Sequence, residues 1–108
     1  MIKRVKVYDL KRINKDCFWE YDFSEDDILN ISRSMDIKEK KFLFEKILLN
    51  SNEMLQDLEI FNQNDLKYFI EDFEVSVFNY EYNFRRKNIA EVCFLNKELL
   101  IDELKWVA

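Results

Sequence analysis

Two clusters of carboxylates are the residues of this chain whose type and spacing most readily suggest chemistry. They are Glu25, Asp26 and Asp27 in one cluster and Glu71, Asp72 and Glu74 in the other. Carboxylates can ligate Mg²⁺ or Ca²⁺, or act as general acids. Their spacing fits no calcium loop, because an EF-hand also needs a glycine at its sixth position and the chain has none. We expect no metal and no cofactor, and interpret both clusters as helix N-terminal charge and solvated faces.

The absence of histidine and glycine excludes most familiar catalytic sets. A sequence with no His and no Gly can form no Ser-His triad, no Cys-His pair, no P-loop and no Rossmann fingerprint. Glu39-Lys40-Lys41 and Glu103-Leu104-Lys105 match the Glu-x-Lys part of a nuclease motif. Both fall in expected helices, where such a metal site would ordinarily use a strand end. We predict that the protein is not an enzyme and has no catalytic residues.

The composition is that of a folded globular domain. The chain has 108 residues, of which 48% are hydrophobic, 16% aromatic and 36% charged. This length corresponds to about one domain of roughly 100 to 200 residues, and no linker-like or repeated segment divides it. We therefore predict a single domain over residues 1–108. With no long apolar run and no signal-peptide pattern, we expect a cytoplasmic protein without membrane contact, whose Cys17 and Cys93 remain reduced.

Asn, Asp and Ser must mark the ends of the elements, since Gly and Pro are absent. Capping-box patterns at Ser24 and Asp36 open two helices, and the second, over residues 37–49, turns four apolar side chains inward. They are Leu43, Phe44, Ile47 and Leu48. Asn50 with Glu53 is expected to open a third helix, and residues 62–64 to end it and start another. The predicted fold is mainly α, one compact domain of about five helices.

The two ends of the chain and the segment over residues 75–84 are harder to assign. Alternation over Arg4–Tyr8 predicts a short N-terminal β-strand. Residues 75–84 satisfy both a helical and a strand spacing, and we favour a break near Asn79 followed by a helix to about residue 90. We expect an extended piece over residues 92–95, after which Asn96 caps a last helix.

Charge is distributed unevenly along the chain. Its net value is −5, from 22 acidic and 17 basic residues. A nucleic-acid-binding domain normally has an excess of Lys and Arg, so the acidic total favours a basic protein partner. A basic arm and a basic run with aromatic neighbours keep nucleic-acid binding open as the alternative. The candidate contacts are Lys3, Arg4, Lys6, Lys11, Arg12, Arg85, Arg86 and Lys87.

The stretch Phe18-Trp19-Glu20-Tyr21-Asp22 carries a resemblance. With Phe44-Glu45-Lys46-Ile47-Leu48 at the end of the predicted helix over residues 37–49, and with residues 61–66, it resembles small bacterial domains of unknown function that begin with a Phe-Trp-x-x-Asp motif. Those domains are often encoded beside nucleotidyltransferase-type toxins, so the resemblance, over about residues 18–95, implies an antitoxin role. Asn stands here where that family tends to have Gly, and Asn is the other residue that tolerates a left-handed cap. The Ser-Pro pair of the family has no counterpart.

We therefore predict a non-enzymatic, acidic protein that binds and restrains a partner protein, as antitoxins, immunity proteins and phage inhibitors do. A nucleic-acid-binding regulator and a structural homo-oligomer subunit remain alternatives, and a homodimer is compatible with each. Aromatic residues are enriched at protein interfaces, and the acidic clusters suit a basic partner. The candidate partner-binding residues are Trp19, Asp22, Glu25, Asp26, Asp27, Glu71, Asp72 and Glu74.

Overall fold

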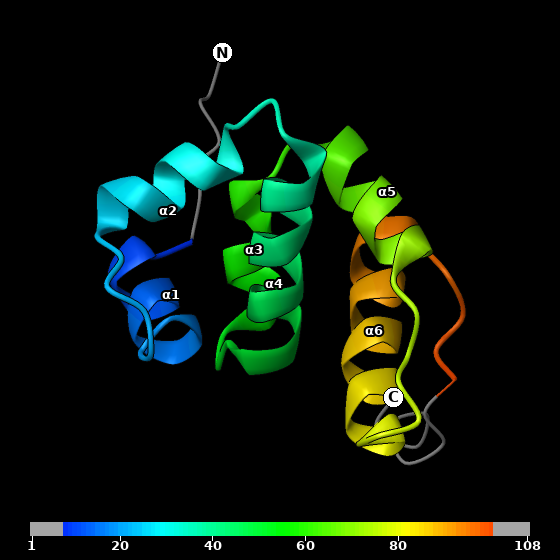
Figure 1. Ribbon diagram of the computed structural model, residues 1–108. Coiled ribbons are helices and arrows are strands. Elements are labelled where there is room, and N and C mark those ends of the chain that lie inside the picture. The colour runs from blue at the N-terminus through cyan, green and yellow to red at the C-terminus, as the bar shows by residue number, and fades with distance from the viewer. Residues whose placement is uncertain (1–7, 101–108) are drawn as a thin grey trace. The chain divides into compact units, whose positions relative to one another are not determined.

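Helices follow one another along residues 8–100, which are the residues that the computed structural model describes (Figure 1). The elements are α1 (Leu10–Cys17), α2 (Glu25–Ser32), α3 (Ile37–Asn50), α4 (Met54–Asp57), the 3₁₀ helix η1 (Leu58–Ile60), α5 (Gln63–Asp72) and α6 (Tyr80–Leu95). This part of the chain contains no strand, so the mainly α prediction is confirmed. The predicted strand Arg4–Tyr8 lies, apart from Tyr8, outside the described residues.

Backbone contacts divide the chain into two compact units. Unit 1 is Met1–Leu66 and unit 2 is Lys67–Ala108. The predicted single domain over residues 1–108 stays a prediction.

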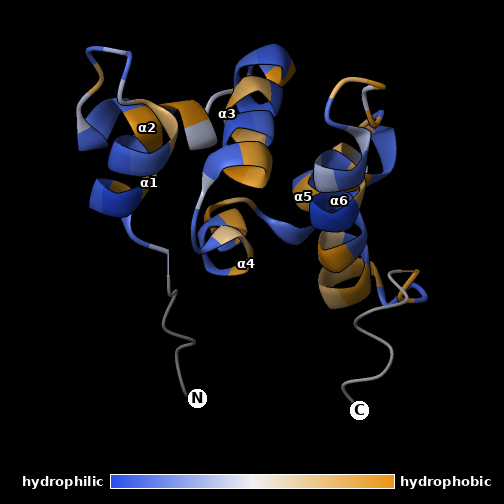
Figure 2. Cartoon of the chain, turned by 90° about the horizontal axis from the view of Figure 1, so that it is seen from below, coloured by the Kyte–Doolittle hydropathy of each residue, from blue (hydrophilic) through white to orange (hydrophobic). Residues whose placement is uncertain are grey.

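The core of unit 1 lies between helices that are neighbours in the sequence. The first three helices pack on one another, and α4 and η1 pack on α3. All four side chains predicted to face inward from α3 are fully buried, together with Ile13 of α1 and Ile28 of α2. Polar and apolar residues alternate along α3 with a helical period (Figure 2). Each such side chain contributes about 1.5 to 3 kcal/mol when it is removed from water.

Short polar side chains begin the helices of unit 1. The Ser24 hydroxyl accepts from the Asp27 backbone N–H, and the Asp27 carboxylate accepts from the Ser24 N–H, which confirms the predicted capping box. Asp36 caps α3 by accepting from the Lys38 N–H at 2.9 Å. Its expected partner Glu39 instead accepts from the Ser34 hydroxyl, so the second box is not reciprocal.

The predicted start of the third helix is wrong by several residues. Asn50 is the last residue of α3, and the N-cap position of α4 belongs to Glu53. The Asn50 amide donates to the Lys46 carbonyl, one turn back, so it serves a helix end. Asn62 does begin α5 as predicted, because its side-chain oxygen accepts from the Asp65 N–H at 2.8 Å.

In unit 2, two left-handed asparagines bound α6. Asn79 has a φ of 57° and precedes the helix, which confirms the predicted break, and Asn96 has a φ of 56° and ends it. The expected extended piece over residues 92–95 is wrong, since these residues continue the helix. Asn96 likewise opens no helix over residues 97–100. Phe69, Ile70 and Phe73 are buried in this unit, as is Ala90 of α6.

Candidate protein-binding surface

The segment between α1 and α2, residues 18–24, is built on a cluster of aromatic rings. The ring of Phe18 is buried and lies 5.3 to 5.9 Å, between centroids, from those of Tyr21, Phe23 and Phe42. Tyr21 and Phe23 stack at 5.2 Å. The Lys46 ammonium lies 5.2 Å from the centroid of the Tyr21 ring, within the range of a cation–π contact. The Tyr21 N–H also donates to the Phe18 carbonyl at 2.9 Å, which closes the turn.

Hydrogen bonds hold both neighbouring helices to this segment. The Asn14 side chain of α1 donates to the Phe23 carbonyl at 2.9 Å. One residue later, the capping box of Ser24 and Asp27 starts α2. The segment is thus fixed at its rings, at its backbone and at the helix that follows it.

Trp19 follows Phe18 in the sequence but is largely exposed to solvent. Its side chain is 74% exposed, whereas the adjacent Phe18 is buried. Five exposed carboxylates follow it within eight residues along the chain, and we call these residues, together with Trp19, the Trp19 surface. Its members are Trp19, Glu20, Asp22, Glu25, Asp26 and Asp27. The last three occupy the first turn of α2, where negative charge also favours the helix dipole.

The second acidic cluster belongs to unit 2. Glu71 and Asp72 end α5, and Glu74 follows it in the connecting segment; all three are exposed. Carboxylates at a helix C-terminus interact unfavourably with the helix dipole, so the dipole does not account for them there. The two clusters that the sequence predicted as one type of site thus lie in different units.

The candidate nucleic-acid contacts are divided as well. Lys3, Arg4 and Lys6 are outside the described residues. Lys11 is exposed on α1. The others are Arg12, which is engaged in an internal ion pair, and Arg85, Arg86 and Lys87 on α6. The Lys87 ammonium donates to the Phe73 carbonyl, and the Arg86 guanidinium lies 5.5 Å from the Tyr82 ring centroid, so both already make contacts within unit 2.

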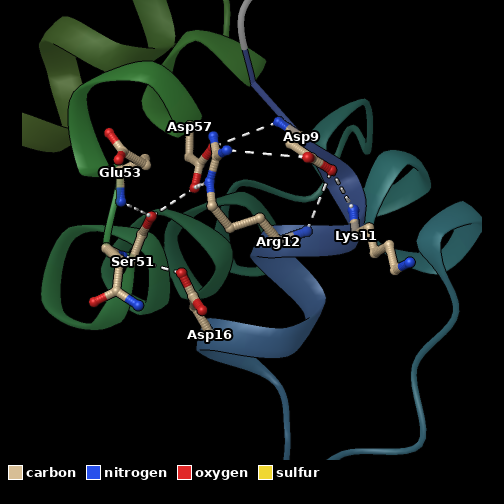
Figure 3. Close-up of polar contacts among 8 residues, drawn as sticks. Asp9, Lys11, Arg12, Asp16, Ser51, Glu53 and Asp57 are labelled. Atoms are coloured by element: carbon tan, nitrogen blue, oxygen red, sulfur yellow. Dashed lines mark hydrogen bonds and ion pairs between the residues drawn. The ribbon is translucent and has the colours of Figure 1, made fainter.

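The most extensive polar contacts of unit 1 surround Asp57, which is 0% exposed (Figure 3). Arg12 donates two hydrogen bonds to it from one edge of the guanidinium, Nη2 to Oδ1 at 2.5 Å and Nε to Oδ2 at 3.3 Å. The Ser51 hydroxyl donates to Oδ2 at 2.5 Å and accepts from the Glu53 N–H at 3.0 Å. The Asp9 N–H donates to Oδ1 at 3.4 Å. A buried carboxylate with this many donors is well compensated for its loss of water.

These contacts join the start of α1 to α4 and to the turn before it. The hydrogen bond to Asp57 raises the pKa of the Arg12 guanidinium above its ordinary value; the charges of Asp57, Asp9 and Glu53 act in the same direction, and partial burial acts against them. The guanidinium is therefore a permanent cation. Since both carboxylate oxygens of Asp57 accept hydrogen bonds from within unit 1, we interpret this cluster as structural. Nothing in the sequence linked Arg12 to a residue 45 positions away.

Other site types find no support in the described residues. Among residues 8–100, no three His, Cys, Asp or Glu side chains are grouped so as to hold a metal ion. Cys17 and Cys93, both among the described residues, form no disulfide; the first is buried and the second exposed. None of the helices described here has the length and apolar character needed to cross a membrane. No family model, no curated protein and no solved structure matches this chain.

Proposed function

We propose that the protein binds and restrains a partner protein, without catalysis, as antitoxins, immunity proteins and phage inhibitors do. The observation that carries this proposal is the exposure of Trp19 on an anchored segment, with five exposed carboxylates close to it in the sequence. Tryptophan is enriched among the few residues that dominate binding energy at protein interfaces. Because the segment beneath it is already ordered by ring contacts and hydrogen bonds, little conformational freedom is lost when it binds.

The charge of the Trp19 surface indicates the kind of partner. Five of its six members are carboxylates, and no basic residue interrupts residues 19–27. Such a surface attracts a basic protein surface and repels phosphate groups. The proposal therefore names a protein with a basic site, such as the nucleic-acid-binding or nucleotide-binding cleft of an enzyme. Acidic side chains placed over that cleft would exclude its substrate.

The Phe-Trp-x-x-Asp resemblance supports the same proposal. In this chain the two aromatic residues of the motif have different environments, with Phe18 in the core and Trp19 in solvent. Asp22, three residues after Trp19, is also exposed. A structural residue next to a contact residue is the arrangement expected of a motif that both builds and presents a binding segment. The toxin-like enzymes that accompany the resembled domains belong to the proposed class of partner.

Affinity capture tests the proposal. Tagged wild-type protein, Trp19→Ala and Met35→Ala are each used to capture proteins from nuclease-treated extract of the native cell, and the eluates are compared by mass spectrometry. Met35 is the matched control, because it is a large apolar side chain of unit 1 that is 99% exposed. We expect a stoichiometric basic protein with the wild type and Met35→Ala, and its loss with Trp19→Ala.

Binding measurements on the purified protein and its captured partner then give the size of the effect on Kd. We expect Trp19→Ala to weaken Kd by about 30-fold, the effect of losing a hot-spot residue worth about 2 kcal/mol. Glu25→Gln with Asp26→Asn should slow association, and the slowing should be smaller at high salt. Equal capture by all three proteins, or capture of no stoichiometric protein, would exclude the Trp19 surface as the binding site.

A further inference from the structure

Residues 98–100 follow the end of α6 and are held to it by hydrogen bonds, although none of the three is fully buried. In Figure 1 the chain turns back after α6, and this segment runs alongside the helix. Glu98 is exposed, Leu99 is half-buried and Leu100 is 49% exposed. We call residues 98–100 the strap. Burial of apolar side chains gives the strap little support, so its attachment depends on its hydrogen bonds.

A single side chain of α6, that of Asn88, makes these hydrogen bonds. Asn88 is 1% exposed. Its side-chain oxygen accepts from the Leu100 N–H at 2.7 Å, and its side-chain nitrogen donates to the Glu98 carbonyl at 3.1 Å. The same nitrogen also donates to the Glu91 carboxylate, about one turn along α6, at 3.3 Å. Asn88 thus holds the strap through two main-chain groups and not through the side chains of the strap.

The chain reverses at Asn96, between α6 and the strap. Asn96 has a φ of 56° and a ψ of 35°, in the left-handed region that asparagine tolerates. Its own N–H and that of Lys97 both donate to the Glu91 carbonyl, an arrangement that ends many helices. These bonds complete α6 without any group of the strap. The helix end and the strap are therefore held by separate sets of hydrogen bonds.

We propose that the strap opens and closes over Asn88 as a unit, while α6 and the core of unit 2 stay folded. Opening breaks the two hydrogen bonds to the strap and leaves the contact between Asn88 and Glu91 in place, because that contact lies within α6. The groups that separate are neutral amides, which water can satisfy once they are exposed. Unit 2 accordingly has two states, one in which the Asn88 carboxamide is covered and one in which it meets solvent.

The described core of unit 2 does not include the strap. Its buried apolar side chains belong to α5, to the residue after α5 and to α6, and they are Phe69, Ile70, Phe73 and Ala90. Opening of the strap therefore exposes little apolar surface. A local opening of this kind depends weakly on denaturant, whereas unfolding of the whole core depends on it strongly. The two events can thus be distinguished by experiment.

Native-state hydrogen exchange tests the proposal on the full chain. The exchange rates of the Leu100 and Ala90 backbone N–H groups, relative to their intrinsic rates, are measured by NMR at several guanidinium chloride concentrations below the unfolding transition. We expect the Leu100 N–H to exchange about tenfold or more faster than the Ala90 N–H, which needs a larger opening. The Leu100 rate should be nearly independent of denaturant, whereas the Ala90 rate should rise with it.

Two variants of Leu100 separate the main chain of the strap from its side chain. Leu100→Pro removes the N–H from which Asn88 accepts, and Leu100→Ala keeps this N–H and shortens an exposed side chain. In Leu100→Pro we expect the backbone order parameters of Glu98 and Leu99 to fall from about 0.85 to below about 0.6, and in Leu100→Ala to stay near the wild-type values. Exchange at the Lys97 N–H, which belongs to the end of α6, should change by less than about twofold in both.

Three results would overturn the inference. If the Leu100 rate shows the same denaturant dependence as the Ala90 rate, the strap leaves only when unit 2 unfolds. If Leu100→Pro leaves the strap as ordered as in the wild type, Asn88 does not hold it. If exchange at Lys97 rises as much as at the strap, the end of α6 opens as a whole. The inference is independent of the proposed function, because Trp19→Ala should leave all of these measurements unchanged.

Discussion

Unit 1 and unit 2 each hold a segment at the end of a helix with a buried polar side chain, but the two side chains differ in charge. We call each such side chain, with its hydrogen-bond partners, a clamp. In unit 1 the Asp57 carboxylate accepts from the Asp9 N–H, just before α1. In unit 2 the Asn88 amide accepts from the Leu100 N–H at 2.7 Å and donates to the Glu98 carbonyl at 3.1 Å, beyond α6.

The difference between these clamps lies in what remains when one partner is lost. Asp57 carries a charge, so it needs the Arg12 cation and the Ser51 hydroxyl as well as the backbone. Removing the cation leaves a buried charge without compensation, which is among the most destabilising changes in proteins. Asn88 is neutral, and its removal leaves only backbone groups that water can reach once the segment opens. We therefore expect unit 1 to be the more sensitive of the two to a single polar substitution.

Arg12→Ala should have the largest effect. We expect it to lower the free energy of unfolding by about 3 kcal/mol, because Asp57 then stays buried without its cation. Chemical denaturation measures this value, and Lys11→Ala, an exposed neighbour on the same helix, should change it by less than about 0.5 kcal/mol. In a double-mutant cycle with Asp57→Ala, the two losses should be strongly non-additive. A loss no larger than that of the control would show that the carboxylate does not depend on Arg12.

Asn88→Ala should have an intermediate effect. It removes the two hydrogen bonds to the segment over residues 97–100, and we expect the free energy of unfolding to fall by about 2 kcal/mol. Hydrogen exchange at the Leu100 amide should accelerate in parallel. Asn64→Ala is the control, an exposed asparagine of α5. If Arg12→Ala proved less costly than Asn88→Ala, the contrast between a charged and a neutral clamp would be wrong.

Ser24→Ala should have a smaller effect than either. The capping box is exposed, so water can replace part of the hydrogen bonding that the Ser24 hydroxyl provides. We expect the free energy of unfolding to fall by about 1 kcal/mol. Ser24→Asp restores an acceptor for the helix N-terminus and should recover most of the loss, as thermal unfolding can show. No recovery with Asp would indicate that the hydroxyl has a role other than capping.

Alkaline pH should have the smallest effect on the clamp of unit 1. The folded-state pKa of Arg12 is raised above its unfolded-state value, so the contribution of Arg12 to stability is fully present below the unfolded-state pKa and is lost only as the pH rises through the folded-state pKa. The difference in stability between wild type and Arg12→Ala should accordingly be the same at about pH 7 and about pH 10. A difference that shrinks over this interval would mean that another titrating group supplies it.

The sequence predicted those features of the fold that depend on local patterns. The interior positions of α3 follow from a helical period within 14 residues, and the break at Asn79 follows from the tolerance of Asn for a left-handed backbone. It did not predict α1, which is mostly polar and buries only Ile13 and Cys17, too few residues to establish a period. Asn96 was misassigned because Asn is favoured both at the start and at the end of a helix.

The candidate site was predicted only in part, because only its local sequence features could be recognised. The acidic residues near Trp19 are visible in the sequence, and the structure places them at the surface. Which of Phe18 and Trp19 enters the core was not predictable, because a non-helical segment has no period that fixes the side facing inward. Asp57 was missed because its partners Arg12 and Asp9 are distant in the sequence and meet only through packing of the helices.

The packing of α1 to α4 on their neighbours in the sequence also bears on how unit 1 forms. Contacts between consecutive helices close short loops, a topology that folds within microseconds to milliseconds in small helical proteins. With no proline in the chain, no peptide-bond isomerisation of tens of seconds delays the process. The link between Arg12 and Asp57 spans most of the unit and needs both helices in place, so we expect it to form after the transition state. Its strength would then set the rate at which unit 1 unfolds rather than the rate at which it folds.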